Sequence, residues 1–346
     1  MKAVVIRAPN HAFFRDEADP KAGDGQVLVK VAVAGVCMSD VEVMRGTRPL
    51  PYVKYPIIPG HEWCGTVEAV GSGVKRIAPG DRVAVEGHNF CRACDWCSRG
   101  ETNLCASYNE LGFTLPGGFA EYVAVRADLA HPFATALPFE AAAMVEPFAC
   151  VVHGAQRARV QREDTVAVVG PGTIGLLAVG WAAMARPARL VAIGLDRGNE
   201  ATARKMGATD YLTVRDDPAA KVREMTGGAG ADVVFETAGS ETAVTLALAL
   251  ALDLARRGGA VILSGIAGGN RRMFLESDVF SLKDLRVDGV FAYTTASFEQ
   301  ALRIVESGKL DVRPLVTHTL PLQEFEKAFD LLSKRPEPVV KVMLRP

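Results

Sequence analysis

Three distant segments of the sequence carry side chains that could share one metal ion. His61 and Glu62 are adjacent, Cys37 precedes them and Glu146 follows them. Zinc binds thiolate sulfur, imidazole nitrogen and carboxylate oxygen, and a catalytic zinc keeps one position open for water or substrate. A lone His in a glycine-flanked turn is more often structural. The evidence for a metal site is therefore the combination of all four residues and not His61 alone. One Cys, one His and one or two Glu predict a catalytic metal site.

A second group of thiols lies within one short stretch, 91–105: Cys91, Cys94, Cys97 and Cys105. Four thiolates form a closed tetrahedral shell that is typical of structural zinc. Two disulfides or an iron–sulfur cluster are the alternatives, and disulfides are disfavoured in the cytosol. Because four thiolates leave zinc no open position, this group is expected to be structural and not the reaction centre.

Composition limits the classes of function. The chain has 346 residues, of which 49% are hydrophobic and 23% charged, as in ordinary globular proteins with room for two domains. A net charge of -1 and a pI near 6.6 disfavour nucleic acid and anionic membranes as partners. The apolar run 243–254 is short and predicts a buried helix, not a membrane span. With no signal-like start and seven cysteines, we expect a cytoplasmic protein.

The metal-site residues lie in a region of short strands punctuated by Gly and Pro, which predicts a β-rich barrel or sandwich. Ser39 and Asp40 are typical of a helix start, so the simplest role for Ser39 is a cap for helix 41–45. A helix is expected over 139–144, and Pro147 would bend it just after Glu146. Such a bend could aim that carboxylate inward, although an exposed Glu on a helix is commoner.

The pattern changes at Thr165. A buried-type strand, 166–169, leads into a G-x-G-x-x-G turn and then a helix, 176–184, which is the context in which this motif binds a dinucleotide pyrophosphate. Strands and helices then alternate, predicting a doubly wound parallel sheet. The turn contains the candidate cofactor residues Gly170, Gly172, Thr173, Ile174 and Gly175. The further expected elements are strands at 190–193, 232–235, 260–263 and 339–344, and helices at 242–254, 298–305 and 323–332.

Taken together, these motifs come in the order seen in zinc-dependent medium-chain dehydrogenases, which the chain resembles over nearly its whole length. The resemblance rests on the cysteine spacing, on Gly60-His61-Glu62, on 79–83 and on the later glycine turn. Glu146-Pro147 resembles the polyol dehydrogenase branch, where a glutamate replaces the second zinc cysteine of other alcohol dehydrogenases. The sequence of residues 109–113 is also similar to that of aminocyclitol and inositol-type dehydrogenases.

That resemblance implies a GroES-like catalytic domain, 1–150 and 291–346, with a Rossmann domain, 151–290, inserted and the active site in the cleft between them. Cys37 and His61 would hold the catalytic zinc, with Glu62, Glu146 or both completing its shell. Asp40 would orient a ligand, and Ser39 would take the substrate proton. The implied reaction transfers a hydride between a secondary alcohol, of polyol, sugar alcohol or cyclitol type, and NAD(P).

The residues that follow the second strand of the dinucleotide-binding region bear on the choice between NAD and NADP. Dinucleotide-binding units usually end their second strand with an acidic residue for NAD, whereas an Arg there suits NADP. That position could fall on Gly194, and a glycine there goes with NADP in the enzymes that the chain resembles. Asp196, two residues later, could still serve NAD, and Arg197 could meet a phosphate. We expect NAD, with NADP as the alternative. The resemblance also implies cofactor contacts at Ala238, Gly265 and Phe291.

Alternatives remain open at this point. A zinc-free quinone or enone reductase of the same superfamily would lack the ligand set, and a non-catalytic nucleotide-binding module would need a partner surface. L-threonine 3-dehydrogenase shares both zinc signatures. Relatives are mostly dimers or tetramers, so a homo-oligomer is expected.

Overall fold

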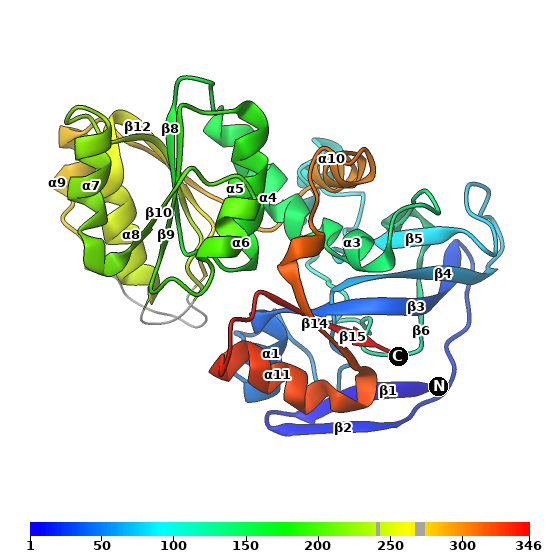
Figure 1. Ribbon diagram of the computed structural model, residues 1–346. Coiled ribbons are helices and arrows are strands. Elements are labelled where there is room, and N and C mark those ends of the chain that lie inside the picture. The colour runs from blue at the N-terminus through cyan, green and yellow to red at the C-terminus, as the bar shows by residue number, and fades with distance from the viewer. Residues whose placement is uncertain (240–242, 267–273) are drawn as a thin grey trace. The chain divides into compact units, whose positions relative to one another are not determined.

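The computed structural model describes residues 1–239, 243–266 and 274–346. Contacts within the chain divide it into two compact units. The first contains Met1–Ala149 and Tyr293–Pro346, and the second contains Cys150–Ala292. Figure 1 shows both units with their helices and strands.

The first unit is built on a mostly antiparallel sheet, in which only β14 and β15 run parallel. The strand order is β14-β15-β3-β4-β5-β7, with β6 paired to β3, and β1 and β2 form a separate hairpin. Its strands are β1 (Lys2–Ala8), β2 (His11–Asp16), β3 (Gln26–Val36), β4 (Glu62–Val70), β5 (Arg82–Val85), β6 (Tyr122–Arg126), β7 (Ala130–Pro132), β14 (Val316–Pro321) and β15 (Lys341–Arg345).

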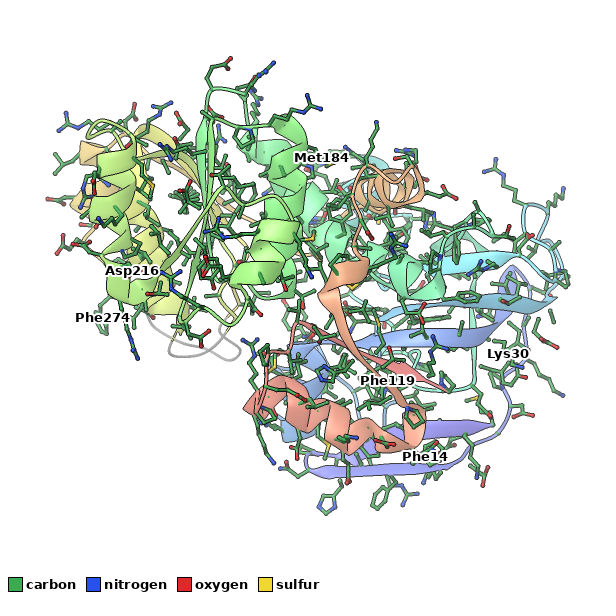
Figure 2. All side chains as sticks on the ribbon, in the orientation of Figure 1. Phe14, Lys30, Phe119, Met184, Asp216 and Phe274 are labelled. Atoms are coloured by element: carbon green, nitrogen blue, oxygen red, sulfur yellow. The ribbon has the colours of Figure 1, made fainter. Side chains whose placement is uncertain are left out.

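The helices of this unit are short apart from two near the C-terminus. α11 buries Phe325, Ala328, Phe329 and Leu332, which share one helical face, against the core of the sheet. Phe119, labelled in Figure 2, is fully buried in the same core, with its ring 6.2 Å from that of Phe329. The helices are α1 (Met38–Arg45), α2 (Asp95–Ser98), α3 (Phe139–Ala143), α10 (Thr295–Glu306) and α11 (Phe325–Lys334), with 3-10 turns η1 (Thr102–Leu104), η2 (Ala127–Leu129), η4 (Arg313–Leu315) and η5 (Leu322–Glu324).

Two local expectations were wrong. α1 begins at Met38 with Cys37 as its N-cap, so Ser39 lies inside the first turn and is not the cap. The reason is that the Asp40 carboxylate accepts a hydrogen bond from the Cys37 N–H and closes the turn one residue earlier. The bend expected after Glu146 is also absent from its predicted place. The helix α3 ends with Met144 as its C-cap, and a new helix, α4 (Val145–Ala158), begins before Glu146 and accommodates Pro147 in its first turn.

The second unit is a six-stranded parallel sheet in the order β10-β9-β8-β11-β12-β13. Figure 1 shows α5 and α6 on one face of this sheet and α7, α8 and α9 on the other, so the expected doubly wound fold is confirmed. The strands are β8 (Thr165–Val169), β9 (Arg189–Gly194), β10 (Asp210–Thr213), β11 (Ala231–Glu236), β12 (Ala255–Leu263) and β13 (Arg286–Gly289). The helices are α5 (Thr173–Ala185), α6 (Glu200–Lys205), η3 (Val214–Asp216), α7 (Pro218–Met225), α8 (Ala243–Leu254) and α9 (Asp278–Leu282).

α8 covers the apolar run that the sequence assigned to a buried helix. Six of its side chains, including Leu248 and Leu252, are buried. The expected first residue, Thr242, lies outside the described residues. Among the residues that are described, no helix is both long and apolar enough to cross a membrane.

Candidate active site and metal centres

The first unit brings Cys37, His61 and Glu62 together. Their possible ligand atoms all lie within 4.8 Å of one another. β3 and β4 are antiparallel neighbours in which Gly35 pairs with Glu62, so Cys37 emerges from β3 beside the start of β4. A Cβ on Gly35 would lie 2.3 Å from a Glu62 carboxylate oxygen, so glycine is needed there to make room for the carboxylate.

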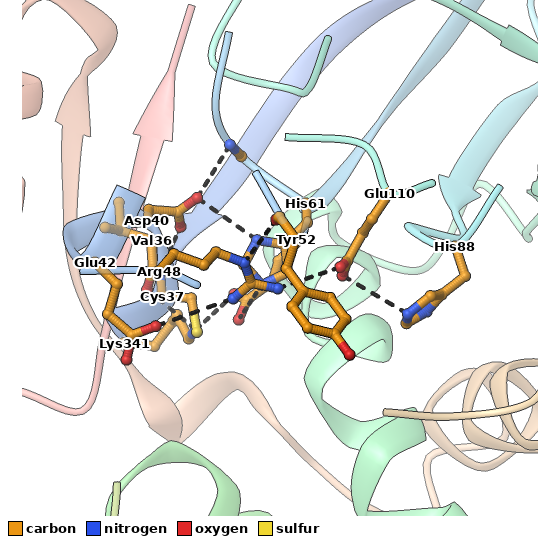
Figure 3. Close-up of polar contacts among 12 residues, drawn as sticks. Val36, Cys37, Asp40, Glu42, Arg48, Tyr52, His61, His88, Glu110 and Lys341 are labelled. Carbon is orange, nitrogen blue, oxygen red and sulfur yellow. Dashed lines mark hydrogen bonds and ion pairs between the residues drawn. The ribbon is translucent and has the colours of Figure 1, made fainter. Parts of the chain in front are cut away.

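Asp40 supports this group from a fully buried position on α1. One of its carboxylate oxygens accepts from the Cys37 N–H at 2.8 Å. The other accepts from the Gly60 N–H at 3.1 Å and lies 3.5 Å from His61 Nδ1 (Figure 3). Asp40 therefore fixes the segments that carry two candidate ligands and faces the ring nitrogen opposite Nε2, the one nearer Glu62.

Lys341 also belongs to this site, although it was not among the site residues predicted from the sequence. It lies on β15, is 2% exposed, and donates to Glu62 Oε2 at 2.5 Å and to the Val36 carbonyl at 3.2 Å. Glu62 Oε1 remains directed towards His61, 3.9 Å from Nε2. A lone charged residue inside the apolar run 339–344 was the available signal.

Glu146 is also buried near this group, in the first turn of α4. Burial raises its pKa to about 8, His61 opposes that rise and the Glu62 carboxylate adds to it. Its carboxylate is not in the group whose ligand atoms lie within 4.8 Å. Burial disfavours a charged His61, yet Asp40, Cys37 and Glu146 raise the pKa of the imidazole well above its ordinary value.

These donors fit zinc. A thiol, an imidazole and a carboxylate oxygen converge, with Asp40 facing His61 Nδ1 and Glu62 Oε1 directed towards His61 Nε2. Three acidic side chains of this site, Asp40, Glu62 and Glu146, are buried, and the buried Lys341 pairs with Glu62. A cation at this point would offset that excess of acidic groups. Ser39 lies half-buried on α1 between Cys37 and Asp40 in the chain.

The four cysteines of the 91–105 lobe also converge, with their sulfurs within 4.8 Å of one another. The Cys91 N–H donates to Cys105 Sγ at 3.2 Å, and the Ala93 N–H donates to Cys91 Sγ. Backbone N–H groups of Ala106 and Cys97 lower the pKa of Cys94 to about 6. Backbone N–H groups directed at the sulfurs stabilise thiolates, the form that binds metal.

A polar cluster formed by Arg48, Glu42 and Glu110 is separated from His61 by the ring of Phe113. The Arg48 guanidinium stacks 3.8 Å from the centre of the Phe113 ring, which itself lies 4.7 Å from the His61 ring. Arg48 is flanked by two carboxylates, Glu110 at 3.5 Å and Glu42 at 4.0 Å (Figure 3). No sequence signal marked Arg48, because Glu110 and Phe113 come from a segment about 60 residues further along the chain.

In the second unit the glycine turn connects β8 to α5. Gly170 has φ +89, a left-handed conformation that suits glycine, and a Cβ on Gly175 would lie 2.2 Å from the Gly170 carbonyl. A Cβ on Gly172 would meet nothing within 4 Å. Thr173 and Ile174 open α5, whose N-terminus faces this turn. The turn is therefore close-packed on its inner side and open at Gly172, as a pyrophosphate cradle requires.

The remaining candidate cofactor residues occupy strand ends and loops of the same unit. Gly194 is the last residue of β9, so no acidic residue ends that strand. Asp196 is exposed and accepts from the Gly198 N–H at 2.7 Å. Arg197 is paired with Glu200 at 2.7 Å and with Asp216 at 3.8 Å. Ala238 and Gly265 lie just beyond β11 and β12, and Phe291, 37% exposed, lies just beyond β13.

Known proteins match the chain along its length. The alcohol dehydrogenase GroES-like domain matches residues 23–135 and the zinc-binding dehydrogenase domain matches residues 173–307. A sorbitol dehydrogenase from Bacillus subtilis (strain 168) is 32% identical, covering 100% of this chain and 97% of that protein. A D-arabitol-phosphate dehydrogenase from Enterococcus avium is 32% identical, covering 99% of this chain and 97% of that protein.

Solved structures agree with these matches. A zinc-binding dehydrogenase from Sinorhizobium meliloti 1021 bound to NADP has a TM-score of 0.92 and 29% identity, covering 100% of this chain and 99% of that one. A short chain alcohol dehydrogenase from E. coli CFT073 complexed with NADH has a TM-score of 0.91 and 27% identity, with the same coverage.

The chain belongs to the zinc-dependent medium-chain dehydrogenases, in the branch that includes the polyol dehydrogenases. It is accordingly a zinc-containing oxidoreductase with a GroES-like domain and a Rossmann domain, as expected from the sequence. This membership argues against the zinc-free reductase and the non-catalytic module.

Proposed function

We propose that this protein oxidises a neutral polyol, sugar alcohol or cyclitol at a secondary hydroxyl, with NAD as hydride acceptor and NADP as a weaker one. The observation that carries the proposal is the convergence of Cys37, His61 and Glu62 in a buried acidic group of a zinc-dependent dehydrogenase. Bound there, zinc would act as a Lewis acid that lowers the cost of removing the hydroxyl proton.

The chain's own residues have distinct tasks in this proposal. Cys37, His61 and Glu62 Oε1 hold the catalytic metal, and Glu146 is a nearby carboxylate. Asp40 orients His61, and Lys341 holds the second Glu62 oxygen. Ser39 takes the hydroxyl proton, and the four cysteines of the 91–105 lobe hold a structural zinc. The two units are the catalytic and the dinucleotide-binding domains.

The charge around Arg48 favours a neutral substrate over a phosphorylated one. Some relatives are named for phosphorylated polyols, such as D-arabitol-phosphate and galactitol-1-phosphate dehydrogenases. Here the guanidinium already lies between Glu42 and Glu110, so it offers no uncompensated positive charge to a phosphate. A guanidinium beside carboxylates instead provides both donors and acceptors, which suits hydroxyl groups.

The dinucleotide is proposed to bind at the Gly170–Gly175 turn. Asp196 is exposed just past β9, whereas the charge of Arg197 is compensated by Glu200 and Asp216. That arrangement favours ribose hydroxyls over a 2′-phosphate. Ala238, Gly265 and Phe291 are proposed as further contacts. We also place the protein in the cytoplasm as a homo-oligomer, a tetramer or dimer; the cytoplasmic assignment is in keeping with cysteines that form no disulfide among the described residues.

The test is a spectrophotometric screen of polyols, cyclitols, amino alcohols, L-threonine and polyol phosphates, with NAD and NADP in parallel. We expect NADH formation with neutral polyols or cyclitols and none with Cys37→Ser, because that variant lacks the thiolate ligand. L-threonine 3-dehydrogenases are also among the relatives. A preference for L-threonine or for a polyol phosphate would overturn the substrate assignment, and full activity of Cys37→Ser would overturn the metal site.

A further inference from the structure

The inference concerns Glu236, the last residue of β11 in the second unit. Its side chain is completely buried on a central strand of the parallel sheet. Burying a carboxylate is unfavourable unless hydrogen bonds compensate for the lost water. A carboxylate retained at such a position is expected to have a task that an apolar residue could not perform.

Both carboxylate oxygens of Glu236 are used to hold backbone. Oε1 accepts from the Ala238 N–H at 2.8 Å, and Oε2 accepts from the Gly265 N–H at 3.2 Å. These two N–H groups belong to the described segments that directly follow β11 and β12, 237–239 and 264–266. A Cβ on Gly265 would lie 2.4 Å from Oε2 and 2.4 Å from the Ala238 carbonyl, so the two loops are in close contact.

The next residue, Thr237, holds a third loop. Its hydroxyl lies 2.8 Å from both the Val169 and the Gly170 carbonyls, to which it donates, and its N–H donates to Val169 at 3.0 Å. A Cβ on Gly175 would lie 2.7 Å from this hydroxyl oxygen. Thr237 is therefore packed directly against the glycine turn after β8.

We propose that Glu236 and Thr237 form a clip that fixes the backbone at Gly170, Ala238 and Gly265, just beyond three neighbouring strands at the carboxyl edge of the sheet, and thereby sets the affinity for the dinucleotide. β8, β11 and β12 are adjacent and parallel, so their following loops share one edge. Ligands of doubly wound sheets bind at that edge. Backbone N–H groups that are fixed beforehand do not have to be ordered on binding, which strengthens affinity. The inference rests on the proposed site for the dinucleotide.

The first test is Glu236→Gln, which keeps the side chain's size but turns an NH2 group towards one of the two N–H donors. We expect the Kd for NADH, measured by fluorescence titration of the zinc-loaded protein at pH 8, to rise about tenfold or more. The KM for NAD should rise by a similar factor while kcat changes less than about twofold. Glu224→Gln, at an exposed position of the same unit, is the matched control and should bind NADH as wild type does.

A second pair of variants decides the matter if Glu236→Gln does not fold. Thr237→Val removes the hydroxyl donor and should weaken NADH binding, whereas Thr237→Ser keeps it and should bind nearly as wild type. Folded Glu236→Gln, or Thr237→Val, that binds NADH within twofold of wild type would overturn the clip.

Gly172→Val separates this inference from the site on which it depends. A side chain there meets open space in the protein, so the variant should fold, but it would occupy the proposed pyrophosphate position. Unchanged NADH binding by Gly172→Val would overturn the proposed dinucleotide site itself. If Gly172→Val loses binding while Glu236→Gln and Thr237→Val bind NADH as wild type does, only the clip is overturned.

Discussion

Lys341 Nζ lies 2.5 Å from Glu62 Oε2, and both side chains are 2% exposed. The two residues are 279 positions apart in the chain and meet because β15 and β4 are both hydrogen-bonded to β3. Burial opposes the charge on Lys341, but Glu62 and Cys37 raise its pKa above the ordinary value. The ion pair therefore holds one carboxylate oxygen and leaves the other directed towards His61.

Lys341→Met should leave a buried carboxylate without its partner. Removing one member of a buried pair typically costs about 3 to 5 kcal/mol of stability. We expect the zinc-free variant to be destabilised by that order and kcat to fall at least about tenfold, because Glu62 loses its orientation. Zinc should still bind, since the change makes the surroundings more negative. Lys341→Arg keeps the charge and is the control; denaturant unfolding, zinc content and turnover are the measurements. Unchanged turnover in the Met variant would show that Glu62 needs no such support.

Asp40→Asn should weaken the catalytic metal. The carboxylate accepts from two backbone N–H groups and faces His61 Nδ1, whereas an amide has only one acceptor oxygen. Loss of such an outer partner typically lowers metal affinity or activity about 10- to 100-fold. Competition with a chelator measures the affinity, and Asp19→Asn, at an exposed position of the same unit, is the control. Equal zinc retention by Asp40→Asn and wild type would contradict the role given to Asp40.

The two cysteine-containing groups should lose their metal independently. Cys94→Ser should reduce the zinc content from two ions per chain to one and expose the 91–105 lobe to limited proteolysis, because its fold depends on the metal. Cys37→Ser should also leave one zinc, yet its lobe should stay protected and its turnover should vanish. Elemental analysis and proteolysis distinguish the two variants. A lobe that resists protease equally in Cys94→Ser would argue against structural zinc.

Glu236 should make stability depend on pH. Burial raises the pKa of Glu236 to about 7, partly offset by the N–H groups of Ala238 and Gly265. The folded state therefore holds a proton that the unfolded state releases above about pH 4.5, so the folded state loses stability as pH rises towards 7. The full difference, about 3 kcal/mol at most, should be present above pH 7. Melting temperatures of wild type and Glu236→Gln at pH 5.5 and pH 8.5 check this: the wild type should fall relative to the variant, and parallel changes would refute the shift.

Local chemistry in the sequence was enough to find most of the fold. The alternation after Thr165 and the glycine turn predicted the parallel sheet, and β8, β9, β11 and β15 lie close to where the pattern put them. Strands β10, β13 and β14 were missed because they are short or half-exposed, so their side-chain pattern is weak. The helix start at α1 was misplaced because Asp40, not Ser39, supplies the hydrogen bond that closes the first turn.

The sequence by itself determined the chemical types available: a thiol, an imidazole and carboxylates for one metal, four thiols for another, and a glycine turn for a pyrophosphate. Those follow from residue identity and short-range spacing. Only the tertiary structure decided which of them meet, as in the grouping of Cys37 and His61 with Glu62, the reach of Lys341 across the sheet and the clip made by Glu236. Strand register and burial bring distant residues into contact, and neither is written in the spacing of the chain.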